Sequence, residues 1–144
     1  MATVNSYLTF NGNTEEAFNF YKSVFGGEFT YIGKFKDMPA DENCPPPSAE
    51  EGELIMHVSL PISKETILMG SDATSFSGNV TFGTNFSVSI NTDSKEEADT
   101  LFNGLSAGGK VTMPMEKTFW GAYFGMFTDK FGINWMVNFD EMPK

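Results

Sequence analysis

The sequence contains no arginine, one cysteine and no long apolar run. Its 9 lysines stand against 19 acidic residues, which gives a net charge of −10. Because phosphate recognition depends on clustered arginine and lysine, nucleic acid, nucleotides and anionic membranes are excluded as expected partners. No apolar stretch approaches the roughly 20 residues that a bilayer span requires.

The N-terminal segment "MATVNSYLTF" lacks the basic and apolar regions of a secretory signal. The single cysteine, Cys44, permits no internal disulfide, which suits a reducing compartment. We therefore expect a cytoplasmic, soluble protein. At 144 residues the chain fits one domain of ordinary size, with a core large enough to be stable without disulfide bonds.

An internal repeat is the most informative feature. The segments "NTEEAFNFYKSVFGG" (13–27) and "SKEEADTLFNGLSAGG" (94–109) align at an offset of 81 residues. Their apolar residues fall at helical spacings. Asn13 with Glu16, and Ser94 with Glu97, have the spacing of an N-cap and capping box. Paired glycines follow each segment, as expected where a helix ends.

Alternating segments surround each helix and predict strands. In the first half they are 4–11, 28–35, 53–60 and 65–71, and in the second half 84–91, 110–115, 121–128 and 133–139. The fold class is therefore α+β, with two βαβββ modules that form a pseudo-symmetric cup. We expect one domain, 1–144, with module 1 at about 1–72, a linker at about 73–82 and module 2 at about 83–144. The acidic, proline-rich loop 36–52 is expected to be a flap or disordered.

The repeat, the helix "EEAFNFYKSVFGGE", the segment "ENCP" and the C-terminal "TFW" with "FGMFTDKFGINWMVNF" together resemble one family. It is the PhnB-like branch of the glyoxalase, bleomycin resistance and extradiol dioxygenase superfamily, also called vicinal oxygen chelate. The resemblance covers essentially the whole chain. It implies paired modules, a cup-shaped cavity and frequently a homodimer, but not one particular reaction.

Enzymes of that superfamily place His, Glu or Gln ligands of a divalent metal on the first and last strands of each module. Carried onto this chain, those positions are Ser6, Met69, Ser87 and Met136. Serine hydroxyls and thioethers are poor ligands for such an ion. The resemblance therefore predicts that the standard metal site is missing, and no cofactor is expected, although a divalent metal is the alternative.

His57 and Glu116 are the candidate catalytic residues. His57, the only histidine, lies on a strand where Leu54, Met56, Val58 and Leu60 are expected on one face and Ile55, His57 and Ser59 on the other. It can act as a general base or single ligand, or simply be a hydrogen-bonded histidine. Glu116 precedes a cluster of aromatic rings, where desolvation would raise its pKa, or it is solvated at a strand end.

Trp120, Tyr123 and Phe124 are the candidate ligand-binding residues, either as pocket walls or as core. Alternation predicts that Trp120 and Phe124 do not share a wall with Tyr123 unless a bulge intervenes. Cys44 lies in an acidic loop that disfavours a reactive thiolate. The methionines on strands are expected to fill a deformable core or cavity, with a methionine copper site as the alternative.

The function expected from these residues and the resemblance is binding of a small organic molecule in the cup, without the standard metal. The reaction is undefined. One alternative is a metal-dependent lyase, isomerase or dioxygenase with a rearranged site. Another is a binding protein of the bleomycin resistance type that sequesters a drug, with acidic residues attracting a cationic ligand.

Overall fold

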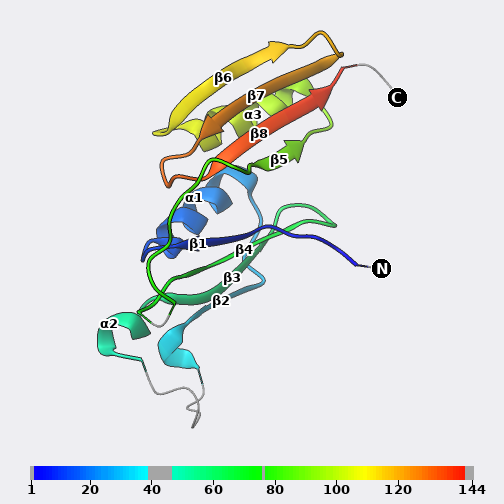
Figure 1. Cartoon of the computed structure of the whole chain (residues 1–144). Coiled ribbons are helices and arrows are strands. Elements are labelled where there is room, and N and C mark those ends of the chain that lie inside the picture. The colour runs from blue at the N-terminus through cyan, green and yellow to red at the C-terminus, as the bar shows by residue number, and fades with distance from the viewer. Residues whose placement is uncertain (1, 39–46, 76, 142–144) are drawn as a thin grey trace. The chain divides into compact units, whose positions relative to one another are not determined.

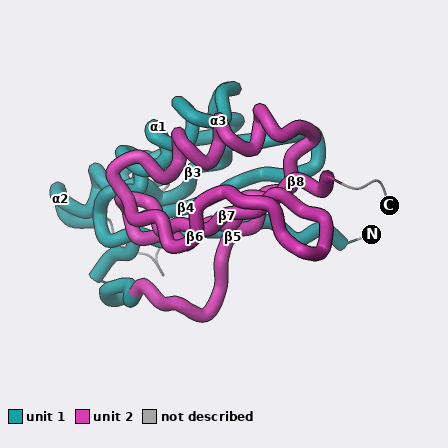
Figure 2. The backbone as a smooth tube through the Cα atoms, turned by 90° about the horizontal axis from the view of Figure 1, so that it is seen from above, with its two compact units in different colours: residues 1–81 teal, residues 82–144 magenta. Residues whose placement is uncertain are grey.

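A computed structural model of the chain describes residues 2–38, 47–75 and 77–141. The chain divides into two compact units, residues 1–81 and 82–144 (Figure 2). Each unit contains one four-stranded mixed sheet and one long helix (Figure 1). Residues 73–81, which the sequence assigned to a linker, group with the first unit. No helix in the described part of the chain is long and apolar enough to span a membrane.

Unit 1 has the order βαβββ that the repeat predicts. Its main elements are β1 (Tyr7–Phe10), α1 (Thr14–Phe25), β2 (Tyr31–Lys34), β3 (Ile55–Pro61) and β4 (Ile67–Asp72), with the short helices η1 (Phe35–Asp37) and α2 (Ala49–Gly52) between β2 and β3. The strand order is β1-β4-β3-β2. β1 pairs with β4 in parallel, and the other two pairings are antiparallel.

Unit 2 repeats this topology. Its elements are β5 (Val88–Asn91), α3 (Lys95–Ser106), β6 (Lys110–Lys117), β7 (Ala122–Thr128) and β8 (Asn134–Asp140). The strand order is β5-β8-β7-β6, again with one parallel pair, β5 with β8. Both predicted βαβββ modules and the α+β class are therefore confirmed. All eight predicted strands are present within a few residues of their expected bounds.

Each helix buries one face of its own sheet. In unit 1 the ring of Phe18 on α1 stands edge-on to Phe10 and Tyr21, and all three are fully buried. A Cβ at Gly70 would approach the Phe18 ring to 2.7 Å, so glycine allows α1 to lie close to β4. In unit 2 the rings of Phe102 on α3 and Phe127 on β7 are 5.1 Å apart, edge to face.

The start of α1 corrects a prediction. Asn13 makes no capping hydrogen bond with its side chain. The buried carboxylate of Asp72, at the end of β4, accepts hydrogen bonds from the backbone N–H groups of Gly12 and Thr14 and from the Thr14 hydroxyl. A residue 58 positions away in sequence therefore caps the helix, which local spacing cannot reveal. In α3 the predicted cap is confirmed, because Ser94 Oγ accepts from Glu97 N at 3.0 Å.

The face assignment of β3 is also corrected. Ile55 is buried together with Val58 and Leu60, whereas Met56 is only half-buried. Gly33 pairs with His57, but Lys34 pairs with Ile55, so β3 carries one extra residue there. This β-bulge reverses the alternation and turns Ile55 toward the core.

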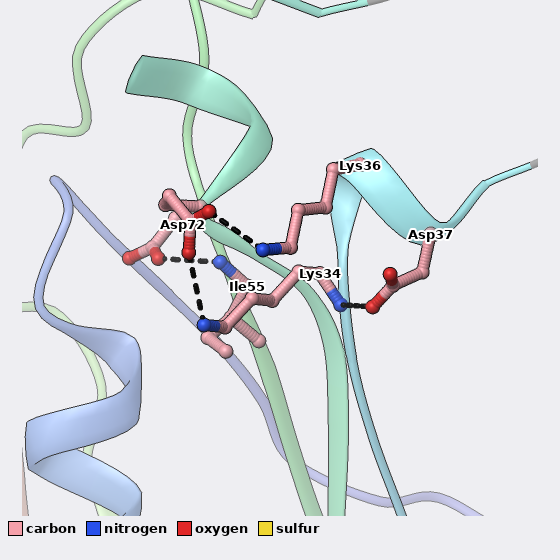
Figure 3. Close-up of polar contacts among 6 residues, drawn as sticks. Lys34, Lys36, Asp37, Ile55 and Asp72 are labelled. Atoms are coloured by element: carbon pink, nitrogen blue, oxygen red, sulfur yellow. Dashed lines mark hydrogen bonds and ion pairs between the residues drawn. The ribbon is translucent and has the colours of Figure 1, made fainter. Parts of the chain in front are cut away.

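The loop 36–52, expected to be a flap or disordered, carries the short helices η1 and α2 in its described residues. Glu53, just after α2, binds Lys34 and Lys36 at 3.0 and 2.7 Å. Figure 3 shows the two lysines near Asp37 and Asp72, with Asp37 bonded to Lys34 N and Asp72 to Ile55 N. The hydrogen bonds from these lysines hold the pKa of Glu53 below its usual value. Glu51 of α2 accepts from Ser75 N at 2.6 Å. Residues 39–46, with Cys44 and all of "ENCP", lie outside the described residues.

The turn "TDKFG" before β8 is held together by a buried aspartate. The buried Asp129 accepts from the backbone N–H groups of Phe131 and Ile133 at 2.8 and 3.0 Å. Its second oxygen accepts from the indole N–H of Trp135 at 2.8 Å. Trp135 is fully buried, so this bond gives its N–H an acceptor that the apolar core would not supply.

Candidate functional site

Each sheet has one face turned away from its own helix, which we call the helix-free face of that unit. In unit 1 the strand register places Tyr7, Met69, Ser59 and Tyr31 in one row across all four strands. Their strand neighbours Leu8, Val58 and Leu68 are buried toward α1, so this row lies on the helix-free face. His57 lies two residues from Ser59 along β3, on the same face.

His57 is the chemical centre of this face. Its Nδ1 lies 3.3 Å from the Tyr7 hydroxyl and its Nε2 lies 2.8 Å from Ser59 Oγ. The Tyr7 and Tyr31 rings lie 5.6 and 6.0 Å from the imidazole. Since a hydroxyl can donate or accept, both ring nitrogens keep a partner whether the imidazole is neutral or protonated. His57 can therefore exchange a proton without losing its orientation.

Gly33 makes room for this cluster. A Cβ at position 33, which pairs with His57, would overlap the hydroxyl and ring of Tyr31. Glycine therefore lets the Tyr31 ring fold over β2 toward the imidazole. Both tyrosines keep nearly half of their surface accessible, 47% for Tyr7 and 48% for Tyr31. Rings in this position can contact a ligand.

In unit 2 the helix-free face brings together three of the predicted site residues. Glu116 pairs with Phe124 across β6 and β7. The Trp120 ring lies 6.4 Å from that of Phe124 and 5.0 Å from that of Phe119. Glu116 is exposed, which fits the alternative that a glutamate at a strand end is solvated. Trp120 is 61% exposed.

Tyr123 lies on the other face of that sheet. Its hydroxyl donates to Asp99 Oδ1 of α3 at 2.6 Å, and Lys95 Nζ lies 4.6 Å from its ring centre. The hydrogen bond to Asp99, together with burial and the nearby carboxylates, raises the pKa of Tyr123 to about 12. Tyr123 therefore does not share a wall with Trp120 and Phe124, in agreement with the alternation of the strand.

A polar row that the sequence reasoning missed accompanies Phe124. Asn91, Asn138 and Phe124 are aligned across β5, β8 and β7. The Asn138 amide donates to Asn91 Oδ1 at 3.2 Å and to Asp140 Oδ1 at 3.1 Å. These carboxamides can offer both donors and acceptors to a bound molecule. Asn91 and Asn138 lie 47 positions apart in sequence, so only the pairing of β5 with β8 brings them together.

The strand register shows which residues lie beside Met69 and Met136, two of the four positions that the resemblance implies for a metal. The β1 residue beside Met69 is Tyr7 rather than Ser6, and the β5 residue beside Met136 is Ser89 rather than Ser87. Phenol, hydroxyl and thioether groups do not form the carboxylate and imidazole set that divalent ions prefer. Among the described residues, no three His, Cys, Asp or Glu side chains are grouped to hold a metal.

Comparisons with known proteins cover nearly the whole chain. Residues 2–138 match a family model described as 3-demethylubiquinone-9 3-methyltransferase. The protein YjdN of Escherichia coli K12 is 35% identical over 140 residues, which cover 94% of this chain and 93% of YjdN. The crystal structure of PA1353 from Pseudomonas aeruginosa is 40% identical with a TM-score of 0.82, covering 97% and 98% of the two chains.

Two further structures relate the chain to PhnB proteins and to the wider fold. A PhnB protein from Bacillus cereus is 29% identical with a TM-score of 0.72, covering 96% of this chain and 99% of that one. A glyoxylase, bleomycin resistance protein and dioxygenase domain from Frankia is 12% identical with a TM-score of 0.69, covering 100% and 95%. At that identity the likeness shows the fold alone.

Proposed function

The chain belongs to the PhnB-like family whose model is described as 3-demethylubiquinone-9 3-methyltransferase, and on this premise we propose that it binds a small planar organic molecule. The His57 cluster on the helix-free face of unit 1 supports the proposal most directly. A half-buried imidazole stands between two half-exposed phenol rings, with both nitrogens hydrogen-bonded. Rings supply stacking, while the imidazole and hydroxyls fix a ligand's polar groups.

In this proposal His57 is the proton-transfer residue. A ligand hydroxyl or acidic C–H that reaches the imidazole can give up a proton to it, because Tyr7 and Ser59 support the charged ring. The proposed function includes the cup-shaped cavity that the resemblance implies and any conversion of the bound molecule. The proposed proton transfer does not involve a divalent metal, because the residues at the superfamily's metal positions do not fit one.

The second candidate function is sequestration of a cationic aromatic molecule. The helix-free face of unit 2 favours it, since the exposed carboxylate of Glu116 lies beside Phe124 and the largely exposed Trp120. A cation is attracted both to a carboxylate and to ring faces. The chain's net charge of −10 would add long-range attraction.

A binding screen tests both functions. Thermal shifts with a library of phenols, quinols, keto acids and cationic aromatic compounds reveal ligands, because binding to the folded state raises stability. Quinols are tested with and without S-adenosylmethionine, since the family description names a methyl transfer. Calorimetry then compares the wild type with His57→Gln, Trp120→Ala and Tyr123→Phe.

The three variants separate the outcomes. Loss of affinity by tenfold or more in His57→Gln, with Tyr123→Phe unchanged, supports the first proposal. Loss only in Trp120→Ala supports sequestration. A ligand that binds all three variants like the wild type would show that neither face forms the site.

Two expectations accompany this proposal. We propose that the protein works in the cytoplasm, as its single cysteine suggests, and that it forms a homodimer, as the resemblance implies. Sedimentation equilibrium of the full chain measures the assembly directly, and a monomer at micromolar concentration contradicts it.

A further inference from the structure

Three methionines stand side by side on the helix-free face of unit 2. Met113 pairs with Met126 across β6 and β7, and Met126 pairs with Met136 across β7 and β8. Paired residues share a face, so three neighbouring strands each contribute one thioether to the same row. Ser89 of β5 ends the row. We call Met113, Met126 and Met136 the thioether row.

Two bulges in β6 create this row. Register shifts lie between Val111 and Met113 and between Met113 and Glu116. Because of these shifts Met113 faces away from α3. On a regular strand it would share the face of Val111, which pairs with the buried Phe127. Met115 faces α3 instead, since a Cβ at Gly125 would meet its sulfur at 2.7 Å. The row is thus a product of the strand register and is invisible in the spacing of the sequence.

The row is accessible and its sulfurs can converge. Met113 is 46% exposed, and Met126 and Met136 are half-buried. Neighbouring strands are about 4.8 Å apart, and paired Cβ atoms about 5 Å, which is less than the length of a methionine side chain. Three unbranched thioethers can therefore turn toward one point above the central residue, Met126.

We propose that the thioether row binds a soft monovalent cation, Cu(I), with the three sulfurs as its ligands. Thioether sulfur selects soft ions and discriminates against Mg²⁺, Ca²⁺ and Mn²⁺, which prefer oxygen. Glu116 lies on the same face one row away, and its carboxylate adds an attractive charge. This site shares only Met136 with the superfamily's divalent metal positions and does not depend on the proposed function.

Titration with Ag(I), a redox-inert stand-in for Cu(I), tests the proposal. The full-length protein is first alkylated at Cys44, because a thiolate binds soft ions more tightly than thioethers do. Methyl-labelled methionine gives one NMR signal for each of the nine methionines. One equivalent of Ag(I) in chloride-free buffer is expected to shift the signals of Met113, Met126 and Met136 and to leave the others in place.

A pair of conservative variants completes the test. Met126→Leu keeps the side-chain volume but removes the central sulfur, and should weaken Ag(I) binding at least tenfold. Met56→Leu on β3 of unit 1 is the matched control and should bind like the wild type. Unchanged affinity in Met126→Leu, or parallel shifts of all exposed methionine signals, would overturn the proposal. Circular dichroism verifies that both variants are folded.

Discussion

At the scale of single residues, neighbours decide what a group can do. Tyr123 was a candidate because its hydroxyl lies among rings, yet Asp99 already accepts that hydroxyl on the helix side of the sheet. His57 is held differently, because both of its partners are hydroxyls that can exchange donor and acceptor roles. Tyr123 is therefore suited to holding α3 in place, and His57 is suited to the proton transfer that we propose.

The titration of Tyr123 tests this assignment. Its pKa of about 12 lies above the usual value of 10.0, so folding favours the protonated phenol. The stabilisation from the Asp99 bond is complete below pH of about 10 and is lost as the pH rises toward 12. Phenolate absorbance during an alkaline titration should include a late step contributed by Tyr123.

Two variants check that the late step belongs to Tyr123. Tyr123→Phe should remove it and cost about 1 kcal/mol of stability at neutral pH, a value reduced by partial solvent screening. Asp99→Asn should move the step toward the other tyrosines. Late phenolate absorbance of unchanged amplitude in Tyr123→Phe would refute the assignment.

The residues of the site were only partly predictable. His57 and Glu116 were found because of their chemistry, and Trp120 and Phe124 because aromatic residues are dense there. Tyr7, Ser59 and Tyr31 were missed, since they are far apart in sequence and meet only through the pairing of four strands. That Tyr7 lies beside Met69 and Ser89 beside Met136 could not be read from the sequence for the same reason, because register is set by pairing across the sheet.

At the scale of elements, local sequence patterns predicted which helices and strands exist, but not every contact that caps or distorts them. Period and capping residues identified both long helices, and alternation identified all eight strands. The cap on α1 escaped because its acceptor is Asp72 on β4. The bulge in β3 escaped because nothing in "ELIMHVSL" distinguishes Met56 as the extra residue. Both depend on contacts that only the folded sheet creates.

Substitution of Asp72 tests the distant cap. One carboxylate oxygen accepts from Gly12 and Thr14, and the other accepts from Ile55 N at 2.9 Å. Asp72→Asn replaces one acceptor with a donor, so a buried N–H loses its partner. We expect a loss of about 2 kcal/mol in the free energy of unfolding, measured by urea denaturation.

Asn13→Ala is the matched control for that experiment. The Asn13 side chain makes no capping bond, so its removal should change stability by less than about 0.5 kcal/mol. If Asn13→Ala destabilises the protein as much as Asp72→Asn does, the helix is capped locally after all.

At the scale of the whole molecule, duplication preserved the topology while the two helix-free faces diverged. Unit 1 displays an imidazole between phenol rings, and unit 2 displays thioethers, carboxamides and an aromatic cluster. Such divergence is expected where a fold is retained and function resides in a site built on it.

Metal content is the test at this scale. The resemblance places the superfamily's metal ligands at Ser6, Met69, Ser87 and Met136, none of which suits a divalent ion, so we expect less than one equivalent of Zn²⁺, Ni²⁺, Mn²⁺ or Fe²⁺ in the purified protein. Elemental analysis measures this, and thermal shifts with each ion should be small. Stoichiometric metal that disappears in His57→Ala would contradict the expectation and favour a rearranged enzyme site.

Both tryptophans of the chain lie in unit 2, one fully buried with its N–H bound to Asp129 and one largely exposed beside Phe124. Tryptophan fluorescence is therefore an intrinsic spectroscopic probe of unit 2 alone. Trp120 should emit at long wavelength and be quenched by iodide, whereas Trp135 should emit at short wavelength and be protected. Comparing emission with circular dichroism during denaturation can thus show whether the two halves of the chain unfold together or in sequence.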